Sequence, residues 1–132
     1  MKNLNILKTV GLACVVGVSI AACTSMSNNQ SIAKTNNGIL VSTSNRTLYT
    51  SDQDQAGSGR SSCYGQCADN WPPLLVDANA TSYGNFSIIK RDDGTQQFAY
   101  KGKPLYFFIM DKKPDDRNGD NYLNGTWHIV KM

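Results

Sequence analysis

The stretch Pro104-Leu105-Tyr106-Phe107-Phe108-Ile109-Met110-Asp111 decides the fold that we expect for this chain. Aromatic and β-branched side chains occupy both alternating positions, so a strand here would be apolar on both faces. A strand that is wet on one face alternates apolar with polar residues, whereas a strand covered on both faces need not. The stretch therefore predicts a central strand of a small sheet, buried on both faces.

A weaker copy of this stretch lies upstream, at residues 47–54. Two features recur in the same order, a Tyr-x4-Asp pair and a later tryptophan. The members are Tyr49, Asp54 and Trp71 in the first half and Tyr106, Asp111 and Trp127 in the second. This recurrence predicts an internal duplication, with repeats at about residues 38–76 and 86–130.

The spacing within each Tyr-x4-Asp pair has a geometric meaning. Positions five apart point to opposite faces of an unbroken strand. Tyr106 can therefore lie in the core while Asp111 lies just beyond the strand end, where its carboxylate can accept backbone N–H groups of the following loop. We expect the same of Tyr49 and Asp54, and we favour a structural role over a binding role for both pairs.

The other segments predict short strands joined by polar turns. All ten acidic residues are Asp, which suits turns better than helices, and no amphipathic helix of ten or more residues is evident. Hairpins are expected at 38–51 around Ser44-Asn45 and at 86–100 around Asp92-Asp93-Gly94, a closing strand at 126–130, and one helical turn at 63–70. The fold class is thus all-β, a compact antiparallel fold built from two related repeats.

Residues 1–22 predict a lipoprotein signal peptide. Two lysines precede an apolar run that is shorter than the roughly 20 residues needed to span a bilayer. Ile20-Ala21-Ala22-Cys23 resembles the bacterial lipobox, in which the chain is cut before a cysteine that then carries lipid. The resemblance implies lipidation and palmitate on Cys23, and Thr24 after it favours the outer membrane. The alternative is ordinary cleavage that leaves Cys23 as a free thiol.

Residues 24–37 are polar and aperiodic, which predicts a flexible tether before a domain that starts at residue 38. The formal net charge of +3 comes partly from Lys2 and Lys8 of the signal peptide, so the mature chain is nearly neutral. The sequence shows no cluster of basic residues of the kind that binds nucleic acid. The partners that we expect are the membrane, through the lipid anchor, and an envelope protein or extracellular ligand.

Cys63 and Cys67 remain as a pair in an exported chain, which favours a structural disulfide. The alternative is a Cys-x3-Cys metal or thiol-redox site with His128, the sole histidine, as a third ligand. No other cofactor is indicated.

The sequence favours neither a calcium site nor a combination of catalytic residues. Asp111, Asp115, Asp116, Asn118 and Asp120 could attract Ca²⁺, but the EF-hand pattern of a glycine and a final glutamate fails, which favours a solvated loop. One histidine and no glutamate leave few acid–base pairs, so we expect no enzymatic activity.

The chain also resembles a bacterial lipoprotein family with a Tyr-x-(Phe/Trp/Tyr)-x-x-Asp motif, described as secreted repeats of unknown function. Tyr106, Phe108 and Asp111 match the motif in full, whereas Ser51 replaces the aromatic residue between Tyr49 and Asp54. The likeness extends to Cys63-Tyr64-Gly65-Gln66-Cys67 and Trp71-Pro72-Pro73-Leu74. It implies an envelope location and a duplicated unit, and we expect a non-enzymatic binding or interaction module.

Overall fold

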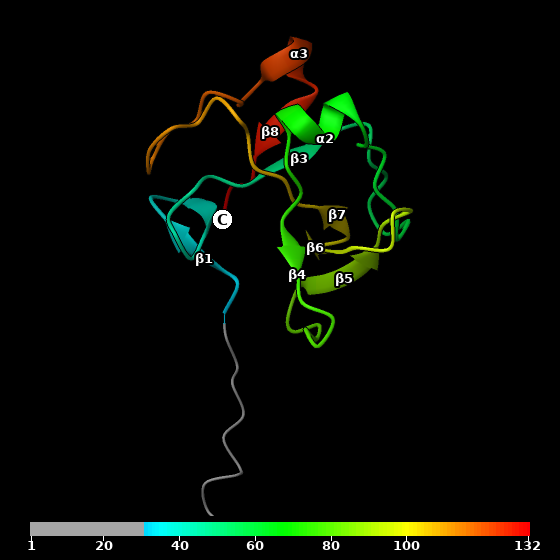
Figure 1. The fold of residues 1–132 in the computed structure, drawn as a ribbon. Helices are drawn as coiled ribbons and strands as arrows, with labels where there is room; N and C mark the ends of the chain where they lie inside the picture. Colours follow the sequence, from blue (N-terminus) through cyan, green and yellow to red (C-terminus); the bar gives the residue numbers. More distant parts are fainter. Residues whose placement is uncertain (1–30) are drawn as a thin grey trace, which may run out of the picture. The chain divides into compact units, whose positions relative to one another are not determined.

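The computed structural model describes residues 31–132. The predicted signal peptide, Cys23 and the first part of the predicted tether lie outside the described residues. The elements follow in this order: β1 (Ala33–Asn36), β2 (Ile39–Ser42), β3 (Tyr49–Ser51), α2 (Gln66–Asn70), β4 (Leu75–Val76), β5 (Phe86–Lys90), β6 (Gln96–Tyr100), β7 (Lys103–Pro104), α3 (Tyr122–Gly125) and β8 (Trp127–Ile129). The described chain is all-β apart from these two short helices, as the sequence predicts (Figure 1).

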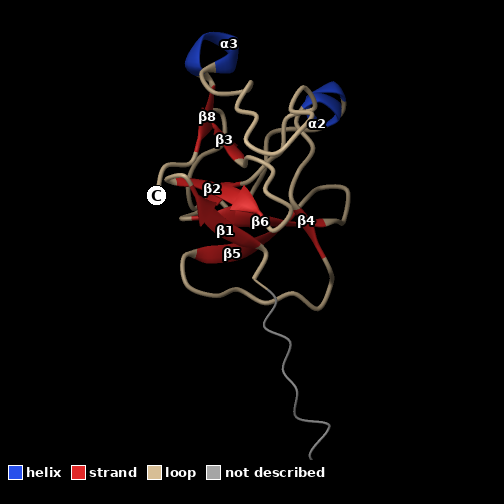
Figure 2. Cartoon of the chain, turned by 90° about the vertical axis from the view of Figure 1, so that its left-hand side faces the viewer, coloured by secondary structure: helices blue, strands red, loops and turns tan. Residues whose placement is uncertain are grey.

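The strands of residues 31–132 form three small antiparallel sheets. β1 pairs with β2, and β3 pairs with β8. In the third sheet β6 has β5 along one edge and both β4 and β7 along the other. Figures 1 and 2 both show α2 and α3 together at one end of the described part, next to β3 and β8.

The hairpin of β5 and β6 confirms the prediction for residues 86–100. The Arg91 N–H donates to the Thr95 carbonyl at 2.8 Å, and the Asp93 carboxylate accepts the Thr95 N–H at 2.9 Å. The next turn, Lys101-Gly102, has positive φ at both residues, as tight hairpin turns require. A Cβ on Gly102 would lie 2.5 Å from the Gly57 nitrogen, so this position also needs glycine for a close approach.

The central stretch is buried up to Phe108 except for half-buried Phe107, but Ile109 and Met110 are exposed, and the prediction of one strand along the stretch is wrong. The strand β7 ends at Pro104, although Leu105, Tyr106 and Phe108 after it are buried. Tyr106 forms bridges to Tyr49 on one side and to Pro73 on the other.

The physical reason is a change of neighbours along this stretch. The Leu105 N–H donates to Phe98 of β6, whereas the Phe107 N–H donates to the Pro72 carbonyl. Pro72 and Pro73 have no N–H groups, so they cannot continue a ladder of paired hydrogen bonds.

The hairpin expected at residues 38–51 needs correction. Its turn exists, since the Ser42 N–H donates to the Arg46 carbonyl at 2.8 Å. The regular partner of β2 is nevertheless β1, and the regular partner of β3 is β8. The tether prediction is therefore wrong for residues 33–36, which form β1 ahead of the turn Asn37-Gly38. Both turn residues have positive φ, the geometry that Asn-Gly favours in hairpins.

The two halves exchange their closing strands. From the first half, β4 pairs with β6 of the second, and from the second half, β8 pairs with β3 of the first. Equivalent hydrogen bonds flank both exchanges: the Leu40 N–H donates to Val130 at 2.9 Å, and the Phe98 N–H donates to Leu74 at 3.0 Å. Each half therefore supplies one strand that pairs with a strand of the other half.

Candidate functional site

The two Tyr-x4-Asp pairs meet at the centre of the domain and exchange partners. The Tyr49 hydroxyl donates to Asp111 Oδ2 at 2.6 Å, and the Tyr106 hydroxyl donates to Asp54 Oδ2 at 2.7 Å. Both tyrosines are 0% exposed, while Asp54 and Asp111 are 3% and 8% exposed. Each tyrosine thus bonds the aspartate of the other half, a pairing that the sequence did not predict.

The second oxygen of each aspartate holds the loop that follows it. Asp111 Oδ1 accepts the Asn118 N–H at 3.0 Å. Asp54 Oδ1 accepts the N–H and the hydroxyl of Ser62, at 2.7 and 2.6 Å. These are the loop contacts that the sequence predicts, because each carboxylate lies just after a buried segment.

Burial raises the pKa of both tyrosines. For Tyr49 the hydrogen bond to Asp111 raises the pKa further, and the Gly119 N–H opposes it. For Tyr106 the contact with Ser61 lowers the pKa, and the bond to Asp54 raises it again. Both phenol groups therefore stay protonated at neutral pH, so each can donate its hydrogen bond to the aspartate of the other half.

We predict that Tyr49 and Tyr106 ionise at higher pH than a tyrosine in an unfolded chain, in an alkaline titration followed by tyrosinate absorbance. Because their folded pKa values are raised, their stabilising contribution is present below the unfolded pKa of about 10 and lost as pH rises through the folded values. Tyr49→Phe should remove one late step. Ionisation of all six tyrosines at the unfolded pKa of about 10, in the folded protein, would contradict this prediction.

The tryptophans of the two halves stack on each other beside this exchange. The rings of Trp71 and Trp127 lie 3.8 Å apart and are tilted by 3°, and Phe108 stacks on the other side of Trp71 at 4.1 Å. Tyr49 meets Trp71 edge-on, and Tyr106 meets Trp127 edge-on. The corresponding residues of the two halves thus form one shared aromatic core, in which the tryptophans stack in parallel and the tyrosines contact them edge-to-face.

A family model described as a secreted repeat of unknown function (Lipoprotein_15) matches the chain twice, at residues 31–75 and 87–131. The chain belongs to this family. No curated protein and no solved structure matches the chain.

The secreted-repeat boundaries agree with the geometry. Each match contains one Tyr-x4-Asp pair and one tryptophan, so both Tyr–Asp hydrogen bonds join one secreted repeat to the other. The first repeat begins at residue 31, earlier than predicted, because it includes β1. Among residues 31–132, no helix has both the length and the apolar content to cross a bilayer.

A buried arginine that the sequence analysis missed extends the exchange between the secreted repeats. The Arg91 guanidinium donates to Ser61 Oγ at 3.0 Å, to Gln97 Oε1 at 2.7 Å and to the Cys63 carbonyl at 2.6 Å. Ser61 in turn hydrogen-bonds the Tyr106 hydroxyl. The network leads from a buried cation, through two hydroxyls, to the Asp54 carboxylate. Nothing in the sequence near Arg91 distinguishes it from a surface arginine.

The disulfide between Cys63 and Cys67 is confirmed, with a Cα–Cα distance of 5.3 Å. The metal alternative would need both thiolates free and His128 beside them. Instead, His128 Nε2 lies 2.9 Å from Asp52 Oδ2. No group of three or more His, Cys, Asp or Glu that could hold a metal occurs among the described residues. The structure therefore gives no support to a metal site at these residues.

The aspartates of the loop after the second motif serve separate partners. Asp116 Oδ2 accepts the N–H groups of Lys112 and Lys113, at 2.8 and 3.1 Å. Asp120 Oδ1 accepts the Ile129 N–H at 3.2 Å. The oxygen atoms are used to fold the loop, in line with the solvated loop that the sequence favours.

We predict that His128→Ala raises the pKa of Asp52. The hydrogen bond with His128 is the main cause that lowers this pKa, and Lys103 contributes less. The pKa of Asp52 is lower in the folded protein than in the unfolded chain, where it is about 3.9 for Asp, so the ionised carboxylate stabilises the fold above that pH. This stabilisation is lost as the pH falls through the folded pKa. Carboxylate NMR titration measures the change. Lys103→Ala should give a smaller rise, and an unchanged Asp52 in His128→Ala would refute the assignment.

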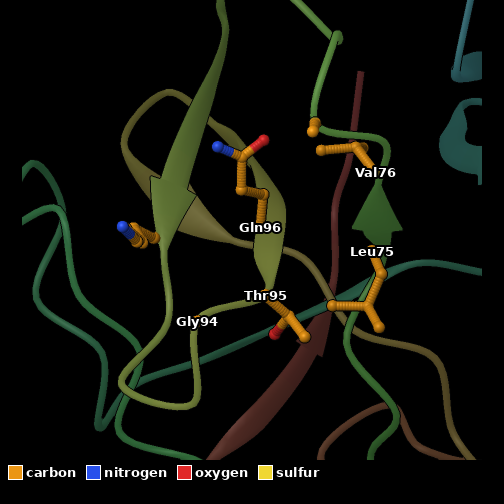
Figure 3. A pocket seen from close by; sticks show the side chains of 7 residues that line it. Leu75, Val76, Gly94, Thr95 and Gln96 are labelled. Carbon is orange, nitrogen blue, oxygen red and sulfur yellow. The ribbon is translucent and has the colours of Figure 1, made fainter.

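Two hollows on the described surface differ in their lining. One, of about 290 Å³, lies between β4 and the β5–β6 hairpin, where Leu75, Val76, Thr95 and Gln96 surround it (Figure 3). Gln96 Oε1 is buried there without a hydrogen-bond partner among the described residues. The other, of about 310 Å³, is lined by three lysines.

Proposed function

We propose that this chain is a lipid-anchored bacterial envelope protein whose duplicated domain is a non-enzymatic binding module. The observation that carries the proposal is the burial of the motif. Tyr49, Asp54, Tyr106 and Asp111 satisfy one another and their loops, so these groups are occupied in holding the two repeats together. We therefore place ligand binding on the surface of the domain and not at the buried motif.

The envelope location is supported by the secreted character of the family and by the lipobox-like residues Ile20-Ala21-Ala22-Cys23. In this proposal Cys23 carries diacylglycerol and palmitate, and the protein is sorted to the outer membrane. The domain is joined to the anchor by the residues between Cys23 and β1. Membrane anchoring through Cys23 and ligand binding at the domain surface require no catalytic group.

Palmitate labelling tests the anchor. Radiolabelled palmitate should enter the full-length chain in a Gram-negative host, and the labelled protein should fractionate with the outer membrane. Cys23→Ser should lose the label, whereas Cys14→Ser should keep it because that cysteine lies in the signal peptide. A wild-type chain without label, or a labelled Cys23→Ser chain, would reject the anchor.

Crosslinking in intact cells tests the binding role. A bifunctional amine reagent should convert part of the wild-type protein into a discrete adduct of higher mass, because the described surface carries exposed lysines. A protein that forms no adduct at any reagent concentration would argue against a stable envelope partner.

A further inference from the structure

The fold gathers three lysines around the hollow of about 310 Å³. Lys101 lies in the turn between β6 and β7, Lys103 is the first residue of β7, and Lys131 follows β8 near the end of the chain. Lys131 is brought there by its bridge to Ile39 of the first repeat. The three lysines therefore come together through the pairing between the two repeats, and they do not form a continuous basic segment in the sequence.

The charge of these lysines is only partly compensated. Lys103 Nζ lies 3.7 Å from Asp52 Oδ1, a contact that Asp52 shares with His128. Among residues 31–132, Lys101 and Lys131 have no carboxylate within 4.0 Å. A hollow lined by charges of one sign focuses its field on a ligand of the opposite sign.

Lys101 adopts the backbone conformation that a tight hairpin turn requires. Its φ is 50°, a left-handed conformation that glycine or asparagine would adopt at less cost. The turn is nevertheless held firmly: the Lys101 N–H donates to Asn85 at 2.8 Å, and the Gly102 carbonyl accepts the Gly57 N–H at 3.0 Å. These bonds fix the position of Lys101 beside the hollow.

Apart from Thr50, the rest of the lining is apolar or aromatic. Tyr100, Ile129 and Val130 are half-buried and contribute to the hollow. The Lys101 ammonium lies 5.5 Å from the centre of the Tyr100 ring, which keeps the charge close to the hollow. The volume is at the lower end of the range for small-molecule sites, so the occupant should be about the size of one sugar ring.

We propose that this hollow binds a phosphate monoester carried on a body of that size, an inference that rests on the proposed binding role. Lysine acts as a point charge that suits phosphate, whereas planar bidentate recognition of a carboxylate favours arginine. A phosphate monoester carries up to two negative charges, which matches the two uncompensated lysines. The ring-sized body contacts Tyr100 and Ile129.

Glucose 6-phosphate is the soluble probe, with glucose and inorganic phosphate as controls, in NMR titrations of the domain at low salt. Amides of residues 100–103 and 129–131 should shift with glucose 6-phosphate and much less with either control. Lys101→Ala and Lys131→Ala should each weaken binding by about threefold. Lys34→Ala, which removes the same charge from the exposed face of β1, should leave binding unchanged.

Vesicles decide the source of the phosphate. If phosphatidylcholine vesicles containing phosphatidic acid bind with the same dependence on Lys101 and Lys131 while glucose 6-phosphate does not, the site takes a lipid phosphate monoester. The proposal is overturned if neither probe binds, or if Lys34→Ala weakens binding as much as the site variants. If neither probe binds while the wild-type protein still forms the crosslinked adduct in cells, the binding role stands and only this ligand class fails.

Discussion

Cut between residues 80 and 81, the domain should give two fragments that are unfolded alone and fold when mixed. Alone, fragment 31–80 lacks β8 as the partner of β3, and fragment 81–132 lacks β4 as one partner of β6. Each fragment also holds one tryptophan of the stack and one tyrosine whose acceptor is missing. A small domain has only about 5–15 kcal/mol of stability, so neither fragment can lose these contacts and remain folded.

The measurement is near-ultraviolet circular dichroism. Each fragment should lack a signal from ordered aromatic rings, and an equimolar mixture should recover it because Trp71 and Trp127 stack only in the complex. As a matched pair, Asp111→Ala in the second fragment should prevent recovery, whereas Asp92→Ala, at an exposed turn position, should allow it. A fragment that unfolds cooperatively by itself would show that the repeats are independent.

Asp54→Ala should be the most damaging single change among the four motif residues. It removes the acceptor of the Tyr106 hydroxyl and of two Ser62 groups, and it shortens the hydrogen-bond chain that leads to Arg91, whose nearest carboxylate is Asp93 at 4.0 Å. Each donor left without its acceptor costs about 1–3 kcal/mol, so the loss of three hydrogen bonds should cost about 3–5 kcal/mol in total. Asp111→Ala removes the acceptor of only two donors, so its cost should be about 1.5–3 kcal/mol.

Denaturant unfolding measures this order. Asp69→Ala, at an exposed position of α2, serves as the control and should change the free energy of unfolding by about 0.5 kcal/mol or less. If Asp54→Ala were as mild as Asp69→Ala, the buried network would not contribute to stability.

Local patterns allowed much of this fold to be predicted from the sequence. The Asp92-Asp93-Gly94 turn and the pairing of Cys63 with Cys67 depend on residues close together in the chain, and each copy of the motif is itself a short local pattern. Burial of Tyr106 follows from its apolar neighbours for the same reason.

The partners of these residues could not be predicted in this way. The spacing of Tyr49 and Asp54 shows that they face different environments, but it does not say which repeat supplies the acceptor for the Tyr49 hydroxyl. The end of β7 depends on Pro72 and Pro73, which lie far away in the sequence. Arg91 is buried because Ser61, Gln97 and the Cys63 carbonyl converge on it, which only the folded chain reveals.

A double-mutant cycle on the free energy of unfolding tests most directly whether the motifs exchange partners. Tyr49→Phe and Asp111→Ala should show a coupling energy of about 1–3 kcal/mol, because each residue is the other's hydrogen-bond partner. Tyr49→Phe and Asp54→Ala, from the same motif, should be additive within about 0.5 kcal/mol. Coupling of Tyr49 to Asp54 instead of Asp111 would contradict the exchange on which this account of the domain depends.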